Sequence, residues 1–235
     1  MRCNVCNAEM VDLGPSQIGV PGRRVACPNL HQPWHINQAK GALMARTADS
    51  YYVTTATGKL VYLDDPKDFD IIDIAIGLSN ICRWGGQMEN HWSVAQHSLA
   101  LCYILSLIYP GDKPLCRAAL LHDAAEAYIG DITRPVLRFV GGNLQTLKNT
   151  LEAAVEHQFN FNGSDQRLKR WDDQIIHVEA EIFGLKKHPA CQQPIDLLDS
   201  EWDMAKKAIT GLFMGMSIPQ ARHNFLNAYF ERRAS

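Results

Sequence analysis

Four residues of this chain combine metal-binding side chains with positions on otherwise apolar helical patterns. They are His97, the adjacent pair His122 and Asp123, and Asp172. A polar side chain that points into an apolar core is strongly unfavourable unless it is paired or binds a metal. One such side chain is common in proteins. Two imidazoles and two carboxylates on three separate segments indicate a metal centre built between helices.

The spacing of the neighbouring residues predicts which side chains point inward. Around each candidate ligand, apolar residues recur every three or four positions, as they do on one face of a helix. Asp173 shares its face with Lys169 and His177, which predicts that Asp173 is solvated and that Asp172 points inward. The three inward faces comprise Val94, His97, Leu101, Ile104, Leu105 and Ile108; Leu115, Ala118, Ala119, His122, Ala125, Glu126 and Ile129; and Leu168, Asp172, Ile175, Ile176, Glu179 and Phe183.

Each candidate ligand also has a simpler explanation when it is taken alone. A single inward histidine is usually a hydrogen-bonded core residue, and a single inward aspartate is usually a helix cap or half of an ion pair. An adjacent His-Asp pair also arises by chance. The prediction of a metal centre therefore depends on the coincidence of three segments, each of which would need a separate explanation.

The ligand set indicates hydrolytic chemistry. Two neutral imidazoles and two carboxylates suit Mn, Fe, Co or Zn, and Mg is also compatible. Four protein ligands on an octahedral ion leave positions for water and for a phosphate oxygen, and the ion lowers the pKa of that water. Glu126 follows His122 by four residues, one helical turn along the same face. It could serve as a general base towards the water or orient His122 by a hydrogen bond, and the sequence leaves both open.

These residues lie in motifs that resemble the HD-domain metal-dependent phosphohydrolases. A Glu three residues after the Asp, as in His122-Asp123-Ala-Ala-Glu126, is typical of the branch with bacterial 5'-deoxynucleotidases and phage deoxynucleoside triphosphohydrolases. The likeness covers roughly residues 58 to 232, and Trp171 departs from it, because the family usually has a small residue before the Asp. The matching segments are Ser93-Val-Ala-Gln-His97-Ser98, Ala119-Leu-Leu-His122-Asp123-Ala-Ala-Glu126-Ala-Tyr-Ile-Gly130-Asp131, and Lys169-Arg-Trp-Asp172 with Glu179-Ala180.

The resemblance implies a substrate and further site residues. It implies a nucleotide phosphohydrolase that cleaves the ester bond to the 5' oxygen, with Asp131 beside the phosphate, although Asp131 could equally be a turn cap. It also implies that Arg83 binds phosphate and that Trp84 contacts the base or sugar. The alternative for these two is a surface Arg beside a packing Trp. Arg134 is a second phosphate candidate. Hydrolysis of a monophosphate and removal of triphosphate both begin with attack on the phosphorus nearest the sugar, so the sequence does not distinguish a monophosphate substrate from a triphosphate.

The first 45 residues carry a different set of candidate ligands. Cys3 and Cys6 are followed, after 20 residues, by Cys27 and His31. This spacing predicts a zinc-knuckle or ribbon-like module with a structural zinc, since four protein ligands leave no open position. His35 competes with His31 as the fourth ligand, and scattered free cysteines are the alternative.

The rest of the chain predicts an all-α fold, an HD-domain helical bundle over residues 58–232, with ligands on facing helices. The segment Lys59–Leu63 is expected to form a short strand, and a Gly-rich break at residues 83–86 opens a loop before the metal-binding segments. Helices are expected over Asp70 to Ile81 and over residues 93–109, 114–129, 143–160, 165–187, 197–213 and 219–232.

Composition narrows the class of protein. The chain has 235 residues and no apolar run approaching 18 residues, which predicts no membrane partner. Its net charge of −2 makes nucleic acid an unexpected partner. Seven cysteines, an odd number, favour a reducing, cytoplasmic compartment. The expected partner is a nucleotide substrate, and a homo-oligomer is left open. The competing interpretation is a low-activity nucleotide sensor whose zinc module binds nucleic acid or a protein.

Overall fold

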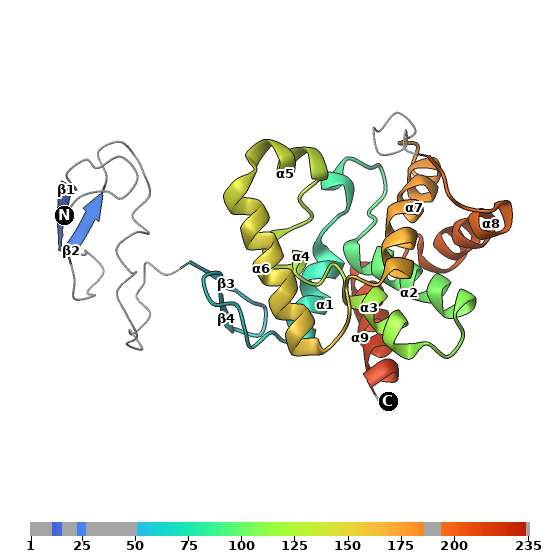
Figure 1. Cartoon of the computed structure of the whole chain (residues 1–235), viewed down its shortest axis with the longest axis horizontal. Coiled ribbons are helices and arrows are strands. Elements are labelled where there is room, and N and C mark those ends of the chain that lie inside the picture. Colours follow the sequence, from blue (N-terminus) through green and yellow to red (C-terminus); the bar gives the residue numbers. More distant parts are fainter. Residues whose placement is uncertain (1–10, 16–22, 27–50, 186–193, 234–235) are drawn as a thin grey trace. The chain divides into compact units, whose positions relative to one another are not determined.

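The structure is a computed structural model that describes residues 11–15, 23–26, 51–185 and 194–233 (Figure 1). The chain separates into two compact units, residues 1–51 and 52–235. In the first unit, strands β1 (Val11–Pro15) and β2 (Arg23–Ala26) pair antiparallel. The predicted zinc ligands Cys3, Cys6, Cys27 and His31 lie outside the described residues, so the zinc module stays a prediction.

The second unit is mostly helical, which confirms the predicted all-α class at the level of helix content. Within the described residues, no helix combines the length and the apolar character needed to span a membrane. The elements after the first unit are β3 (Tyr52–Thr54), β4 (Leu60–Tyr62), α1 (Ile71–Asn80), η2 (Trp84–Gly86), α2 (Val94–Ile108), α3 (Lys113–Leu121), α4 (Glu126–Ile129), α5 (Arg134–Val140), α6 (Gly142–Phe159), α7 (Gln166–Ile182), α8 (Asp199–Ala208), η4 (Ile209–Phe213) and α9 (Ile218–Arg233).

A short hairpin opens the helical unit and is tied to its first helix. Strands β3 and β4 pair antiparallel, and β4 falls inside the segment that was predicted to be a strand. In the turn between them, the backbone N–H and the hydroxyl of Thr57 donate to the two carboxylate oxygens of Asp73 on α1, at 2.8 and 2.6 Å. Asp73 is buried, and these two hydrogen bonds offset part of the cost of burying its carboxylate.

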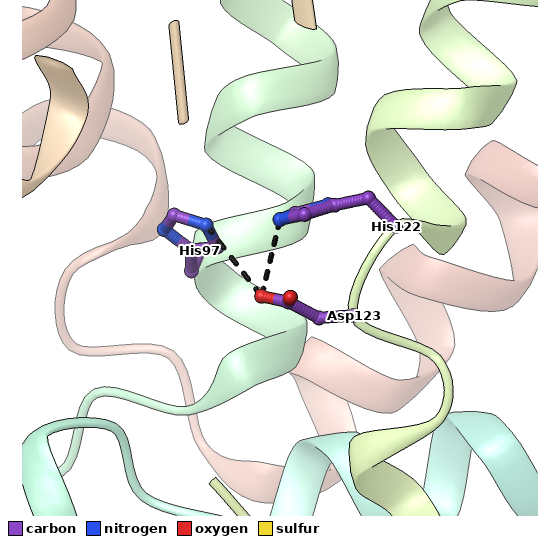
Figure 2. Close-up of side chains that lie close together, drawn as sticks. All are labelled: His97, His122 and Asp123. Atoms are coloured by element: carbon purple, nitrogen blue, oxygen red, sulfur yellow. Dashed lines mark ion pairs between the residues drawn. The ribbon is translucent and has the colours of Figure 1, made fainter. Parts of the chain in front are cut away.

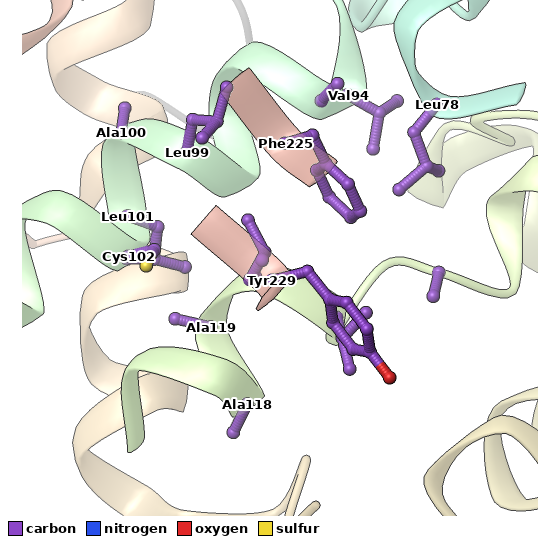
Figure 3. Packing of buried hydrophobic residues seen from close by; sticks show 14 of the residues in the cluster. Leu78, Val94, Leu99, Ala100, Leu101, Cys102, Ala118, Ala119, Phe225 and Tyr229 are labelled. Atoms are coloured by element: carbon purple, nitrogen blue, oxygen red, sulfur yellow. The ribbon is translucent and has the colours of Figure 1, made fainter. Parts of the chain in front are cut away.

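Helix α2 is the central helix of the core, in contact with α1, α3, α7, α8 and α9. It begins at a capping box, in which Ser93 Oγ accepts from the backbone N–H of Gln96 and Gln96 Oε1 accepts from that of Ser93. Figure 3 shows Phe225 and Tyr229 of α9 among buried side chains of α1, α2 and α3, Leu78 and Leu101 included. Burying each large apolar side chain contributes about 1.5–3 kcal/mol.

The predicted helix over residues 114–129 is not continuous, and that prediction was wrong. Helix α3 ends at Leu121, a turn spans residues 122–125, and α4 begins at Glu126. Through this turn the backbone N–H groups of residues 124 and 126 bond to carbonyls three residues back, at 2.9 Å. The helical apolar periodicity continues across the break because these tight turns keep the helical direction of the chain.

The short helix α4 packs closely against α1. A side chain at Gly77 on α1 would lie 2.8 Å from the Cβ of Ala127 on α4, so the glycine permits this approach. Gly130 then ends α4 with a φ of 82°, a conformation that favours glycine. The turn at residues 122–125 is therefore held from both sides, by α3 before it and by the α1–α4 contact after it.

The remaining helices depart from the predicted ranges mainly at their ends. Helix α5 was not predicted, because residues 131–142 contain Pro135 and end in two glycines. Helix α7 ends at Ile182, short of the predicted residue 187, and residues 186–193 lie outside the described part of the chain. The predicted helix over 197–213 becomes α8 followed by the π-helical turn η4.

Candidate metal centre

His97 stands in the continuous helix α2, and its side chain is fully buried. Its Nδ1 lies 2.7 Å from Oε1 of Glu179, which is also fully buried. Its Nε2 faces the opposite way, 3.2 Å from Oδ1 of Asp172 and 3.8 Å from Oδ2 of Asp123. The two ring nitrogens of His97 thus face opposite sides: Nδ1 faces the carboxylate of Glu179, and Nε2 faces the carboxylates of Asp123 and Asp172.

His122 and Asp123 lie in the turn between α3 and α4. The Nδ1 atom of His122 lies 2.8 Å from the backbone carbonyl oxygen of Ala119. Its Nε2 is 3.1 Å from Oδ2 of Asp123 and 3.5 Å from Oδ1 of Asp172. Figure 2 shows His97, His122 and Asp123 pointing toward one another, and one ligand atom from each lies within 4.8 Å of the others.

The hydrogen bonds behind the two histidines fix which ring nitrogen carries the proton. The carbonyl of Ala119 can only accept, and the ionised Glu179 can only accept, so both Nδ1 atoms donate. When the rings are neutral, each Nε2 therefore presents a lone pair to the carboxylates of Asp123 and Asp172. Nε2 of His122 is buried and makes no hydrogen bond. Four acceptor atoms that converge in this way require a cation or added protons, and the donor set fits a divalent metal.

The charges of the site agree with that requirement. Burial lowers the pKa of His122, but Asp123 and Asp172 together raise it well above its ordinary value. Burial would raise the pKa of Asp123 and of Asp172, but the two imidazoles lower both below the ordinary range. Without a cation, the carboxylates thus draw protons onto the imidazoles, and a bound metal ion would supply the same positive charge while leaving them neutral.

The two neighbouring aspartates of α7 point in different directions. Asp172 contacts both imidazoles, whereas the side chain of Asp173 is 57% exposed and pairs with Arg134 at 2.8 Å. The orientation of both aspartates matches the helical periodicity of their segment. Trp171, whose bulk departs from the family pattern, is fully buried and does not displace Asp172 from the site.

Glu179 is a central residue of the site, and sequence reasoning gave it no role beyond its place on the inward face of α7. Its carboxylate accepts hydrogen bonds from Arg83 Nε at 3.2 Å, Trp84 Nε1 at 3.2 Å, Trp92 Nε1 at 3.0 Å and His97 Nδ1 at 2.7 Å. Burial would raise the pKa of Glu179, but Arg83 and His97 lower it to about 2. The signal that could have identified it is its spacing of seven residues from Asp172, which is two helical turns.

Arg83 and Trp84 lie behind and beside the candidate ligands rather than on a free surface. The guanidinium of Arg83 is 11% exposed and contacts Glu179, and its Nη1 is 3.6 Å from Oδ2 of Asp123. Trp84 begins η2 with a φ of 60°, and its indole N–H donates to Glu179. Both residues also line a cavity, so a contact with a ligand is compatible with these internal bonds.

Glu126 is buried at the start of α4 and, within the described part of the chain, makes no hydrogen bond or ion pair with His122. Its Oε1 lies 3.4 Å from Nζ of Lys148, which also pairs with Glu152 at 3.0 Å. Its Oε2 is buried and makes no hydrogen bond. Burial and the charge of Asp123 raise the pKa of Glu126 well above its ordinary value.

Asp131 follows Gly130 and lines the same cavity. Burial raises the pKa of its carboxyl, while the charge of Arg83 and a hydrogen bond from the backbone of Trp84 act in the opposite direction. The hydrogen bond joins the loop after α4 to η2. Asp131 therefore has a structural contact of its own, whether or not it also faces a ligand.

A cavity of about 920 Å³ opens beside the candidate metal ligands. Its walls come from η2, the turn after α3, the loop before α5, and helices α5, α6 and α7. Arg138 and Lys169 line it, and neither has an ion-pair partner among the described residues. Its lining includes Arg83, Trp84, His122, Asp123, Glu126, Asp131, Arg134, Arg138, Lys148, Lys169, Asp172, Asp173, Ile176, His177 and Pro194.

The fold and the site together define a mostly helical protein with a candidate metal centre on one wall of a cavity. No family model matches the chain. It is 36% identical over 110 residues to the uncharacterized protein YfdR of Escherichia coli (strain K12), an alignment that covers 46% of this chain and 58% of that protein. It is 41% identical over 134 residues to the uncharacterized protein RCAP_rcc00048 of Rhodobacter capsulatus, covering 53% of this chain and 68% of that protein.

The chain belongs to the same family as the R. capsulatus protein. It spans less than two thirds of the length of YfdR. Neither relative has an activity attached to its name.

Proposed function

We propose that the chain is a metal-dependent phosphohydrolase of the HD-domain type, acting on nucleotides at the ester bond to the 5' oxygen. The observation that carries the proposal is the convergence of two imidazole Nε2 atoms and two carboxylate oxygens, from His97, His122, Asp123 and Asp172. The sequence motifs of that family fall on these same residues. The nucleotide part of the proposal comes from the resemblance, and the cavity beside the ligands is consistent with it.

The four residues would hold one divalent ion: Mn, Fe, Co, Zn or Mg. When bound, such an ion supplies an acidified water and positive charge that offsets the charge on the phosphoryl oxygens. The protein's own contribution is to orient the imidazoles. Glu179 and the carbonyl of Ala119 hold the two Nδ1 protons, which keeps both Nε2 lone pairs directed into the site.

Glu126 is the proposed general base. Its Oε2 makes no hydrogen bond and is the atom that would accept a proton from water. The alternative role, orienting His122, loses support because His122 Nδ1 bonds to the carbonyl of Ala119 instead. Lys148, at 3.4 Å from Oε1, holds the other oxygen of Glu126 in place.

The phosphate would be bound by cationic side chains of the cavity. Arg83 keeps guanidinium N–H groups beyond those bonded to Glu179, and its position beside Asp123 brings it close to the candidate ligands. Arg138 and Lys169 have no ion-pair partner in the described part of the chain, so both can bind an anion without breaking an existing contact. Asp131 is proposed to lie beside the phosphate, and Trp84 beside the sugar or base.

The N-terminal residues are proposed to bind a second, structural zinc ion through Cys3, Cys6, Cys27 and His31. The test is elemental analysis of the full-length protein. We expect one zinc that persists when Asp172 is changed to alanine and that is lost when Cys3 and Cys6 are changed to serine. A disulfide between Cys3 and Cys6, detected by mass spectrometry of unreduced protein, would contradict the proposal.

The experiment that tests the activity is phosphate release from a panel of nucleoside mono- and triphosphates, with the products identified by chromatography. We expect release that requires a divalent metal and stops with a chelator. Orthophosphate from a monophosphate and inorganic triphosphate from a triphosphate both mark cleavage at the phosphorus nearest the sugar. A panel with no metal-dependent release would favour the alternative, a low-activity nucleotide-sensing or partner-binding protein.

A further inference from the structure

Helix α7 presents a second face to the cavity, beside the face that carries Asp172. Lys169, Asp173 and His177 follow one another at intervals of four residues, and all three line the cavity. The sequence predicts that Asp173 on this face is solvated, and both Asp173 and Lys169 are exposed, whereas His177 is 4% exposed. The face therefore runs from a charged, open end to a buried imidazole.

The imidazole of His177 has an unmet hydrogen-bonding requirement. Its Nδ1 is buried and makes no hydrogen bond, although it belongs to a side chain that lines the cavity. A buried polar atom without a partner is unfavourable and is uncommon in folded proteins. Burial lowers the pKa of His177, so its ring is neutral near pH 7 and offers one donor and one acceptor rather than a positive charge.

The position of His177 relates it to the candidate metal centre. It follows Asp172 by five residues on one continuous helix, which places the two about 7.5 Å apart along the helix axis. The apolar side chains of Ile176 and Pro194 line the same cavity. The cations Arg83, Arg138 and Lys169, by contrast, line the cavity and suit an anion. The cavity thus offers charged groups for a phosphate, and a neutral imidazole with apolar neighbours for an uncharged group.

We propose that His177 determines specificity by hydrogen-bonding the base of a nucleotide whose phosphate lies at the candidate metal centre. A nucleobase carries ring-nitrogen acceptors and N–H donors on a flat, largely apolar frame, which matches a neutral imidazole beside Ile176 and Pro194. A sugar ring between phosphate and base spans the separation along α7. This inference rests on the proposed phosphohydrolase function and adds to it the residue that reads the base.

The competing explanation is that an ordered water alone satisfies Nδ1 of His177, as waters commonly do for buried polar atoms. The two explanations differ in how substrate selectivity responds to a change at residue 177. Loss of a water contact would affect the stability of the protein but would treat all phosphate esters alike. Loss of a base contact would affect only esters that carry a base.

The first measurement is kcat/KM for deoxynucleoside monophosphates and for ribose 5-phosphate, which has the phosphate and a sugar but no base. For His177→Phe, which keeps a ring and removes the hydrogen bonds, we expect about a 10–100-fold loss on the preferred nucleotide and less than about a twofold change on ribose 5-phosphate. His177→Gln should recover part of the loss. His157→Phe, at an exposed position of α6 outside the cavity lining, is the matched control and should change neither substrate.

An equal loss on both substrates, or no loss on any nucleotide, would overturn the role of His177. The second measurement separates this outcome from failure of the proposed activity. The 15N-labelled protein is titrated with each of the four common deoxynucleosides, which carry no phosphate, and the imidazole resonances of His177 are followed by NMR. A saturable shift at His177, absent in His177→Phe, supports the proposal even if no phosphate ester is hydrolysed. No shift with any nucleoside contradicts it even if hydrolysis is found.

Discussion

The two segments that carry the histidines of the site reach it in different ways. His97 stands in the first turn of a continuous helix, and its direction follows from the period of the apolar residues around it. His122 and Asp123 stand in a tight turn between two helices. In a continuous α-helix, adjacent side chains diverge by about 100°, so both members of such a pair would not face one centre. Here Oδ2 of Asp123 lies 3.1 Å from Nε2 of His122.

This difference shows that a short turn between two helices can bring two adjacent candidate ligands to one centre, which a regular helix does not do. A regular helix places one inward residue per turn, each held by its own packing. The turn at residues 122–125 gives up regular helical hydrogen bonds and brings adjacent residues to the same point. Its position is fixed by contacts on both sides, since α3 packs on α2 and α4 packs on α1 through Gly77.

The largest effect is expected at Asp172, on the continuous helix α7. Asp172→Ala removes a carboxylate that faces both imidazoles, so we expect loss of the bound metal and of activity down to background. Asp173→Ala breaks only an exposed ion pair with Arg134 and should keep both. Elemental analysis of the two variants, with circular dichroism to check helix content, decides the matter. If Asp172→Ala kept the metal and Asp173→Ala lost it, Asp173 and not Asp172 would be the metal ligand.

The next effect concerns Glu126, which the turn separates from His122. Glu126→Gln keeps the size of the side chain and removes the base, so we expect kcat to fall by about 10²–10⁴-fold while metal and substrate still bind. Glu152→Gln is the matched control, because Glu152 also pairs with Lys148 and lines the cavity. Steady-state kinetics and metal content are the measurements. A Glu126→Gln enzyme with wild-type kcat would leave Glu126 a structural residue.

A smaller effect is expected behind His97. Glu179→Gln leaves the charge of Arg83 without its buried partner and turns an acceptor of several hydrogen bonds into a weaker one. We expect metal affinity to fall by about 10–100-fold and the free energy of unfolding to fall by about 3–5 kcal/mol. Metal titration and denaturant unfolding measure the two effects. Glu181→Gln, which breaks a surface ion pair with Lys206, should change neither by a comparable amount.

The smallest effect is expected for Arg83→Lys. Lysine keeps the charge but loses the planar guanidinium, whose separate N–H groups can face Glu179 on one side and a phosphate on the other. We expect KM to rise by about 10-fold, with kcat reduced no more than KM is raised, because a phosphate is held in the ground state and in the transition state alike. Arg170→Lys, on α7 but outside the cavity lining, is the control. An unchanged KM would remove Arg83 from substrate binding.

The sequence by itself determined the helical class and most of the faces that meet at the site. Apolar residues at helical spacing predicted α1, α2, α6, α7 and α9 to within a few residues at most ends. They also separated Asp172 from Asp173, since burial of an apolar stripe fixes the rotation of a helix. The predictions of a metal, of its identity and of a structural zinc come from residue types, and they stay predictions.

Only the tertiary structure decided the rest, because it depends on contacts between distant segments. The break after Leu121 follows from packing of α4 on α1, and no local breaker such as glycine or proline announces it between residues 115 and 129. The role of Glu179 arises because side chains from η2, from the loop before α2 and from α2 itself meet at one buried carboxylate. The burial of His177 likewise could not be read from a face that begins with a lysine and an aspartate. Periodicity describes one helix at a time, whereas a partner across the core becomes visible only when the helices are packed together.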